Sequence, residues 1–264
     1  MHHRHQNGKI AMRNKFDHST RGPRVLVTGG TSGLGLALVT ELRRRGAQVA
    51  FIARDRQRVE LTAAEYPGTH GIVGDVADKQ DIHRIALQAA GVLGGIDILI
   101  NNASSLGPVP LALLGDTECE DMELAFATNV LGPFRLTRTL LGALASAARE
   151  GQDGRHSVVL NISSDAAVNA YAGWGAYSAS KAALRHMSAI WDLELAGQGV
   201  RVLAIDPGDM DTPMHAQAVP DADRSGLKRP QDAARELLDA IAEAMADGAR
   251  LEGKLERCLK KEPA

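Results

Sequence analysis

The sequence predicts a single doubly wound α/β domain, with a parallel sheet flanked by helices on both faces. Short apolar runs rich in Val, Ile and Leu alternate with longer stretches of helical periodicity. Strands that are apolar throughout are typical of parallel sheets that are covered on both faces. No Pro-, Gly- or Ser-rich linker divides the chain after residue 23, and 264 residues suffice for a full hydrophobic core.

The apolar runs predict the strands of this sheet. Each run is bounded by a turn signal or by the start of a helical pattern, as expected for buried strands. We expect strands at Arg24–Thr28, Gln48–Ala53, His70–Val73, Ile96–Ile100, Ser157–Ile162 and Val200–Ile205.

The segments between these runs predict the helices. The longest of them carries a Gly-Pro pair at positions 132–133, where we expect a bend because proline disrupts a continuous helix. We expect helices at Leu34–Arg45, Arg56–Glu65, Asp78–Val92, Asp116–Ala148, Ala176–Leu195 and Gln231–Ala246.

Composition excludes several classes of protein. The 30 Lys and Arg nearly balance the 32 Asp and Glu, whereas a nucleic-acid-binding surface needs a basic excess. No apolar stretch is long enough to span a membrane. Cys119 and Cys258 are too few for a disulfide framework or a thiolate zinc site, so we expect no metal site.

The N-terminal segment differs from the rest of the chain. Residues 1–22 are polar, basic and aperiodic, which predicts a disordered tail ahead of a folded domain at 23–264. No apolar segment follows the charged start, as one would in a secretory signal. We therefore expect a cytoplasmic protein.

A glycine-rich turn joins the first strand to the first helix. Residues 28–35 read TGGTSGLG, which places Gly29, Gly33 and Gly35 between the two elements. Glycines let the backbone turn sharply and approach a pyrophosphate, whose charge meets the positive end of the helix. The turn predicts a dinucleotide site of the Rossmann type.

The residues at the end of the second strand indicate whether the site prefers NAD(H) or NADP(H). An NAD enzyme commonly places an acid there to bind the ribose 2′-hydroxyl. Here Ala53 is followed by Arg54, and a guanidinium can bind a 2′-phosphate with a bidentate fork. We expect NADP(H) to be preferred over NAD(H), although Asp55 also fits an ordinary solvated helix start.

Three polar residues form a candidate catalytic group. Tyr177 and Lys181 are four positions apart on a predicted helix, so they share one face. Ser164 follows the fifth strand, at the edge of a parallel sheet where ligands collect. A tyrosine with its usual pKa near 10 is a poor acid–base group at neutral pH, and a nearby ammonium favours its phenolate.

Together these motifs resemble the short-chain dehydrogenase/reductase family. The resemblance spans residues 24–247, and each motif stands in the family's order and spacing. The motifs are TGGTSGLG, Asp75-Val76, NNA at 101–103, Asn129 within TNVLGPF, Ser164, YSASK at 177–181 and PGDMDT at 207–212.

The resemblance implies an oxidoreductase that reduces a ketone or aldehyde to an alcohol, or runs the reverse reaction. Tyr177 would donate the proton to the substrate carbonyl, and Ser164 would hydrogen-bond the carbonyl oxygen. Lys181 would bind the nicotinamide ribose and lower the Tyr177 pKa. Asn129 would hold the water through which Lys181 reaches solvent.

The resemblance also implies the cofactor contacts. Asp75 would meet the adenine, Asn102 the adenosine ribose region, and Thr212 the nicotinamide carboxamide. The remaining expected cofactor residues lie in the same motifs. They are Gly29, Thr31, Ser32, Gly33, Leu34, Gly35, Arg54, Val76, Pro207 and Gly208, together with Tyr177 and Lys181.

Two positions depart from the family pattern. Ser104 replaces the glycine of the usual NNAG motif, and residues 248–264 are charged instead of forming a strand that ends in Gly-Gly. The second departure puts the family's tetramer packing in doubt. The apolar length of Leu124–Ala148 and Ala182–Leu195 still favours a homodimer or homotetramer paired through these helices.

The substrate is less defined by the sequence. Tyr171, Trp174 and Tyr177 crowd into one short stretch and predict an apolar wall for a flat or bulky small-molecule ketone, with local packing equally open. Residues 209–229 predict a mobile acidic lid. Within it, we expect Met210, Met214 and His215 on a solvated loop face.

Two other functional classes remain open from the sequence. One is a non-redox enzyme on the same fold, such as an epimerase or dehydratase that retains the tyrosine and lysine. The other is a non-catalytic protein that senses NADP(H). A complete proton-relay set argues against a pure sensor, because binding alone does not need one.

Overall fold

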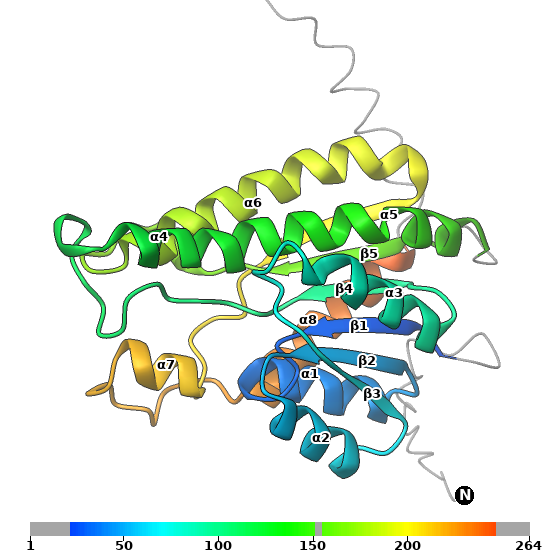
Figure 1. Cartoon of the computed structure of the whole chain (residues 1–264), viewed down its shortest axis with the longest axis horizontal. Helices are drawn as coiled ribbons and strands as arrows, with labels where there is room; N and C mark the ends of the chain where they lie inside the picture. The colour runs from blue at the N-terminus through cyan, green and yellow to red at the C-terminus, as the bar shows by residue number, and fades with distance from the viewer. Residues whose placement is uncertain (1–21, 151–154, 247–264) are drawn as a thin grey trace, which may run out of the picture.

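One six-stranded sheet organises the computed structural model, which describes residues 22–150 and 155–246 (Figure 1). Its strand order is β3-β2-β1-β4-β5-β6, and all neighbouring pairs are parallel. The strands are β1 Arg24–Thr28, β2 Gln48–Ala53, β3 Thr69–Val73, β4 Ile98–Asn101, β5 Ser157–Ile162 and β6 Val200–Ile205. The predicted doubly wound Rossmann fold is confirmed.

Helices cover both faces of the sheet (Figure 1). The helices α1, α2 and α8 pack on one face, and α3, α5 and α6 on the other. Their bounds are α1 Gly33–Arg44, α2 Arg56–Glu65, α3 Asp81–Leu93, α4 Cys119–Phe126, α5 Gly132–Glu150, α6 Gly175–Leu195, α7 Pro213–Ala218 and α8 Pro230–Ala246.

The strands are added to the sheet in opposite directions on the two sides of β1. The chain moves outward from β1 to β2 and β3, then crosses back so that β4 pairs with the other edge of β1. In open parallel sheets a crevice forms at such a switch point, at the carboxyl ends of the strands. The fold therefore directs the loops after β1 and β4 toward a shared site.

The long helix expected at Asp116–Ala148 is instead divided, and this prediction was wrong in detail. It begins at Cys119, since Thr117 and Glu118 have extended backbone. A π-helical turn at Ala127–Leu131 then separates α4 from α5, just before the predicted bend. Pro133 has no N–H, so the α-helical hydrogen bond to the Asn129 main-chain oxygen cannot form.

Smaller boundary differences affect other elements. The fourth strand lies at Ile98–Asn101 rather than Ile96–Ile100, and the third helix begins at Asp81 rather than Asp78. Three-residue 3-10 turns lie at Leu114–Asp116, Asp165–Ala167 and Ala196–Gln198. Residues 1–21 of the tail predicted at 1–22, and all of the charged segment at 248–264, lie outside the described residues.

Candidate active site

A cavity of about 760 Å³ opens at the carboxyl ends of the strands. Residues that immediately follow each of the six strands line it, as the switch point predicts. Every expected cofactor and substrate residue lines this cavity. They are Gly29, Thr31, Ser32, Gly33, Leu34, Gly35, Arg54, Asp75, Val76, Asn102, Ser164, Tyr171, Trp174, Tyr177, Lys181, Pro207, Gly208 and Thr212.

The glycine turn has the backbone that its residues predict. Gly29 and Gly33 have φ values of 70° and 50°, a region that side-chain-bearing residues rarely adopt. A Cβ on Gly35 would lie 2.0 Å from the Gly29 carbonyl oxygen, so only glycine lets α1 approach the turn. The result is a bare backbone at a helix N-terminus, which suits an anionic phosphate group.

Asn102 braces this turn. Its side-chain amide donates to the main-chain oxygens of Thr28 at 2.9 Å and Gly29 at 3.3 Å. The Thr28 hydroxyl in turn accepts from the backbone N–H groups of Asn102 and Ala103. The loop after β4 is thereby tied to the end of β1, and Asn102 shapes the floor of the cavity.

Basic side chains lie at the adenosine end, after β2. Arg54 is exposed and lines the cavity, and it has no carboxylate partner among residues 22–150 and 155–246. Arg58 also lines the cavity, a position that sequence reasoning did not single out as a ligand. Asp55 caps α2 by accepting from the Arg58 N–H at 3.1 Å, so its carboxylate is engaged locally.

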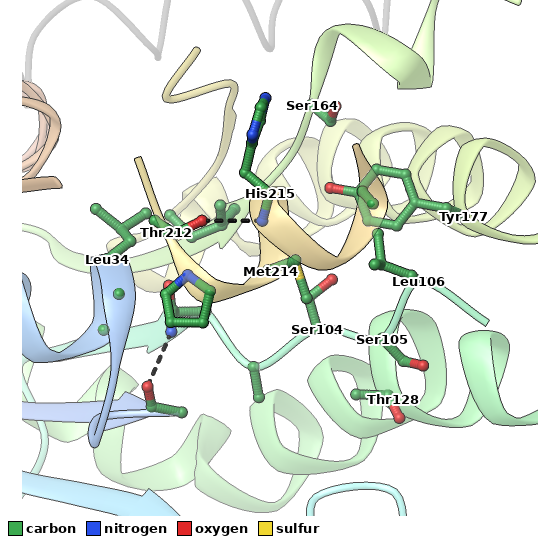
Figure 2. A pocket seen from close by; sticks show the side chains of 18 of the residues that line it. Leu34, Ser104, Ser105, Leu106, Thr128, Ser164, Tyr177, Thr212, Met214 and His215 are labelled. Carbon is green, nitrogen blue, oxygen red and sulfur yellow. Dashed lines mark hydrogen bonds between the residues drawn. The ribbon is translucent and has the colours of Figure 1, made fainter. Parts of the chain in front are cut away.

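Ser164 and Tyr177 lie at the other end of the cavity (Figure 2), and Lys181 also lines it. Lys181 is buried, and its ammonium donates to the Ile162 main-chain oxygen at 2.8 Å. That nitrogen lies 5.5 Å from the centre of the Tyr177 ring. The helix α6 and the end of β5 thus bring together the three side chains that the sequence grouped.

Burial dominates the titration of this group. Burial raises the pKa of Tyr177 to about 12, and a hydrogen bond with Ser164 opposes that rise. The nearby carboxylates of Asp206, Asp165 and Asp209 raise it further. Burial also lowers the pKa of Lys181 to about 8. The site therefore favours a protonated tyrosine, in contrast to the lowered Tyr177 pKa that the resemblance implied, and it weakens the charge of the lysine.

Asn129 lies behind the cavity rather than in its wall. It is fully buried in the π-helical turn, and its amide oxygen accepts from the Ser104 hydroxyl at 3.1 Å and the Ser105 N–H at 2.8 Å. Its amide nitrogen donates to the Ser105 carbonyl and to the Ser180 hydroxyl, both at 2.8 Å. The serine that replaces the family's glycine thus supplies one of four hydrogen bonds to Asn129.

The aromatic stretch divides into two parts. Trp174 packs edge-on against Tyr177, with ring centres 5.7 Å apart, and so forms part of the cavity wall. Tyr171 is 47% exposed, and its hydroxyl donates to the Asp165 carboxylate at 2.7 Å. Sequence reasoning did not single out Asp165, because only the folded loop brings these two side chains together.

The segment 209–229 carries the short helix α7 over the cavity. Thr212 caps this helix by accepting from the His215 N–H at 3.2 Å (Figure 2), and its methyl group faces Gly33 of the glycine turn. Met210, Met214 and His215 line the cavity, which corrects the expected solvated face. Met214 packs against the small apolar cluster that contains Tyr177, and this contact turns α7 inward.

Ser163 is a further residue that sequence reasoning missed. It lines the cavity beside Ser164 and is only 5% exposed, yet its hydroxyl has no hydrogen-bond partner among the described residues. Buried hydroxyls are normally paired, so this one is suited to a bound polar group. Nothing in the sequence distinguishes it from the neighbouring serine.

Within the part of the chain that the structure describes, no helix has both the length and the apolar character needed to cross a membrane.

Known proteins share this architecture. A family model described as short chain dehydrogenase matches residues 23–223. The 2-(R)-hydroxypropyl-CoM dehydrogenase of Xanthobacter autotrophicus is 31% identical over 72% of this chain and 75% of its own.

Two solved structures resemble the fold closely. A 3-ketoacyl-(acyl-carrier-protein) reductase from Brucella melitensis in complex with NADH has a TM-score of 0.77 at 26% identity, over 88% of this chain and 99% of its own. An actinorhodin polyketide ketoreductase with NADPH has a TM-score of 0.74 at 25% identity, over 84% and 91%. The family model, the relative and the shared fold agree, and the chain belongs to the short-chain dehydrogenase/reductase family of oxidoreductases.

Proposed function

We propose that this chain reduces a ketone or aldehyde to an alcohol, or catalyses the reverse, with NADP(H) preferred over NAD(H). The observation that carries the proposal is the cavity itself. One end is a bare glycine turn at a helix N-terminus, and the other holds Tyr177, Ser164 and Lys181. A cofactor that spans the two ends brings its nicotinamide to the tyrosine.

The residues present fit a nicotinamide dinucleotide. The glycine turn accepts the pyrophosphate, and the cavity walls beside Asp75 and Val76 accept the adenine. Thr212 and the unpaired Ser163 hydroxyl lie where polar groups of the nicotinamide end need partners. When bound, the reduced cofactor supplies a hydride to the carbonyl carbon.

The protein's own residues supply the proton and the charge stabilisation. Tyr177 donates its hydroxyl proton to the carbonyl oxygen, and Ser164 hydrogen-bonds that oxygen as negative charge develops. The raised pKa keeps Tyr177 protonated at neutral pH, which suits the reducing direction. Lys181, together with a water held at Asn129, would return a proton to the tyrosine.

The preference for NADP(H) is supported by charge at the end of β2. Arg54, Asp55 and Arg58 all line the cavity, and the Asp55 carboxylate accepts from the Arg58 N–H at the cap of α2. A 2′-phosphate gains guanidinium partners there, and the acid beside them is already engaged by its own helix. The related structures include complexes with NADPH and with NADH, so the preference is argued from these side chains.

We also propose that two chains pair through α4, α5 and α6. Large apolar side chains are exposed along these segments, namely Leu124 of α4, Leu131 of the π-helical turn that precedes α5, and Ile190 and Leu193 of α6. Covering such side chains is a common reason for association. Light scattering of Leu193→Glu and of the unaltered protein tests this, and an unchanged mass would contradict it.

The proposed activity is tested by mixing the protein with NADPH or NADH and a panel of aliphatic, aromatic and polycyclic carbonyls. Loss of the reduced-nicotinamide absorbance, faster with NADPH, is the expected result. Product formation with no net change in that absorbance would instead indicate the epimerase or dehydratase class. Tight NADPH binding with no turnover of any carbonyl would indicate a sensor.

A further inference from the structure

The carboxylate of Asp165 joins the proposed catalytic serine to the aromatic loop. Its Oδ1 accepts from the Ser164 hydroxyl at 3.1 Å, and its Oδ2 accepts from the Tyr171 hydroxyl at 2.7 Å. Asp165 begins the 3-10 turn after β5 and lines the cavity. Each oxygen of the carboxylate therefore holds one hydroxyl donor in the free protein.

This carboxylate is charged at neutral pH. The hydrogen bond from Tyr171, together with those from Ser164 and the Ala166 N–H, lowers the pKa of Asp165, although its partial burial acts in the opposite direction. A partly buried carboxylate needs its donors, because an unpaired charge away from water is costly. Any change at Ser164 thus affects Asp165 as well.

The proposed reaction imposes such a change. Ser164 has a single hydroxyl proton, and in the free protein this proton is directed at Asp165 Oδ1. To hydrogen-bond a substrate carbonyl, the hydroxyl must turn away from that oxygen. Oδ1 then loses its hydroxyl donor, while Tyr171 still holds Oδ2 and keeps the carboxylate in place.

A substrate can supply the missing donor. Ser164 and Asp165 both line the cavity, and the serine hydroxyl lies 3.1 Å from Oδ1, so a carbonyl held by Ser164 brings its neighbouring carbon close to the carboxylate. A hydroxyl or a protonated amine there replaces the serine's hydrogen bond with one of the same charge-assisted kind. A ketone without a neighbouring donor leaves Oδ1 without that hydrogen bond. A carboxylate at the same position would repel the Asp165 carboxylate.

We propose that Asp165 selects ketones that carry a hydroxyl or amino group on the carbon next to the carbonyl, and the corresponding vicinal diols or amino alcohols in the reverse direction. The proposal rests on the proposed reductase function and names its substrate class. In the step itself, a hydride from the reduced nicotinamide forms the C–H bond, and the Tyr177 proton forms the O–H bond. Asp165 binds the neighbouring donor and exchanges no proton.

The charges on the rest of the wall agree with this choice. Asp165, Asp206 and Asp209 all lie close enough to Tyr177 to raise its pKa. The arginines that line the cavity, Arg54 and Arg58, follow β2, on the far side of β1 from the catalytic group. Anionic substrates are thereby disfavoured at the catalytic end, and neutral or cationic donors are favoured.

The test compares 2-hydroxyacetophenone with acetophenone, which differ only in the donor next to the carbonyl. The measured quantity is the ratio of kcat/KM for the two ketones with NADPH. We expect a ratio of about ten or more in the unaltered protein. A site built to hydrogen-bond a substrate hydroxyl strongly rejects the analogue that lacks it. In Asp165→Ala the ratio should fall to about threefold or less.

The kcat/KM ratio of the two ketones distinguishes recognition of the hydroxyl by Asp165 from an indirect effect of the substitution on Ser164. A disturbed Ser164 would slow both ketones alike and leave the ratio unchanged. Asp221→Ala removes an exposed carboxylate that does not line the cavity, and it should retain the full ratio. Tyr171→Phe keeps Asp165 but removes the hydroxyl that holds Oδ2, so it should lower the ratio without abolishing the preference. Asp165→Asn keeps the shape and an acceptor, so it should lose preference for 2-aminoacetophenone more than for the hydroxy ketone.

The outcomes distinguish this proposal from the one on which it rests. Turnover of both ketones at equal kcat/KM in the unaltered protein would overturn the role of Asp165 and leave the reductase standing. A preference that survives in both Asp165→Ala and Asp165→Asn would do the same. Absence of turnover with every carbonyl, despite bound NADPH, would overturn the reductase and this inference together.

Discussion

The ammonium of Lys181 donates to the main-chain oxygen of Ile162, 2.8 Å away, at the last residue of β5. This bond ties α6 to the strand that precedes Ser164. It also holds the ammonium 5.5 Å from the centre of the Tyr177 ring, within a fully buried setting. Lys181 therefore both stabilises the packing of α6 on β5 and places its ammonium near Tyr177. Burial disfavours the charged form of this lysine.

The buried lysine predicts an unusual pH dependence of stability. Because burial lowers its pKa from 10.5 to about 8, the unfolded chain binds more protons than the folded one between these values. Stability contributed by this group therefore rises with pH across that window, by about 3 kcal/mol on an order-of-magnitude basis. Lys181→Met should lose this rise.

Chemical denaturation at pH 8 and at pH 10 provides the measurement. The unaltered protein should gain more unfolding free energy over this interval than Lys181→Met does. The window ends at the ordinary tyrosine pKa of about 10, above which the raised pKa of Tyr177 makes stability fall with pH. Equal changes in both proteins would mean that Lys181 is charged in the fold.

Arg54 should determine the choice between the two cofactors. Arg54→Ala should raise the Kd for NADPH about tenfold or more, since a charge-assisted bond to phosphate is lost. The Kd for NADH should change little. Arg56→Ala is the matched control, because Arg56 is exposed near Glu60 and does not line the cavity. Equal losses for both cofactors in Arg54→Ala would remove Arg54 from the 2′-phosphate site.

Ser180 should support both the fold and turnover. Its buried hydroxyl accepts from Asn129 and donates to the Tyr177 main-chain oxygen at 2.7 Å. Ser180→Ala leaves the Asn129 amide short of a partner, which costs about 1–3 kcal/mol. Ser188 on the same helix makes the equivalent pair of bonds, with Asn161 and a main-chain oxygen, away from the cavity.

The two serine variants separate folding from catalysis. Urea denaturation should show similar losses for Ser180→Ala and Ser188→Ala. Only Ser180→Ala should lower kcat, because only its partners belong to the proposed proton path. Equal kcat values in the two variants would show that the bond to Asn129 is purely structural.

The sequence was most informative for buried strands, because their burial requires uninterrupted runs of mainly apolar residues. The strands β1, β2, β5 and β6 lie at the predicted residues, because each consists mainly of apolar residues. The helix α7 escaped prediction, since its six residues lie in a polar segment and are too short for a periodic pattern. The π-helical turn depends on the four bonds of Asn129, whose partners come from distant segments.

The candidate site shows the same division. Motif spacing grouped Ser164, Tyr177 and Lys181, because fixed elements carry them to one edge of the sheet. Asp165 and Ser163 gave no such signal. Asp165 stands out because its carboxylate accepts from Ser164 and Tyr171, and Ser163 because its buried hydroxyl has no partner among the described residues. Hydrogen-bond partners across a folded loop cannot be read from spacing alone.

The central claim is that Tyr177 is the proton donor for carbonyl reduction in this cavity. The most direct measurement is the single-turnover oxidation of bound NADPH by a ketone substrate in Tyr177→Phe, with the NADPH Kd determined on the same sample. We expect a loss of rate of about a hundredfold or more, as for other general acids, with the Kd nearly unchanged. Retained single-turnover oxidation at an unchanged Kd would contradict the account.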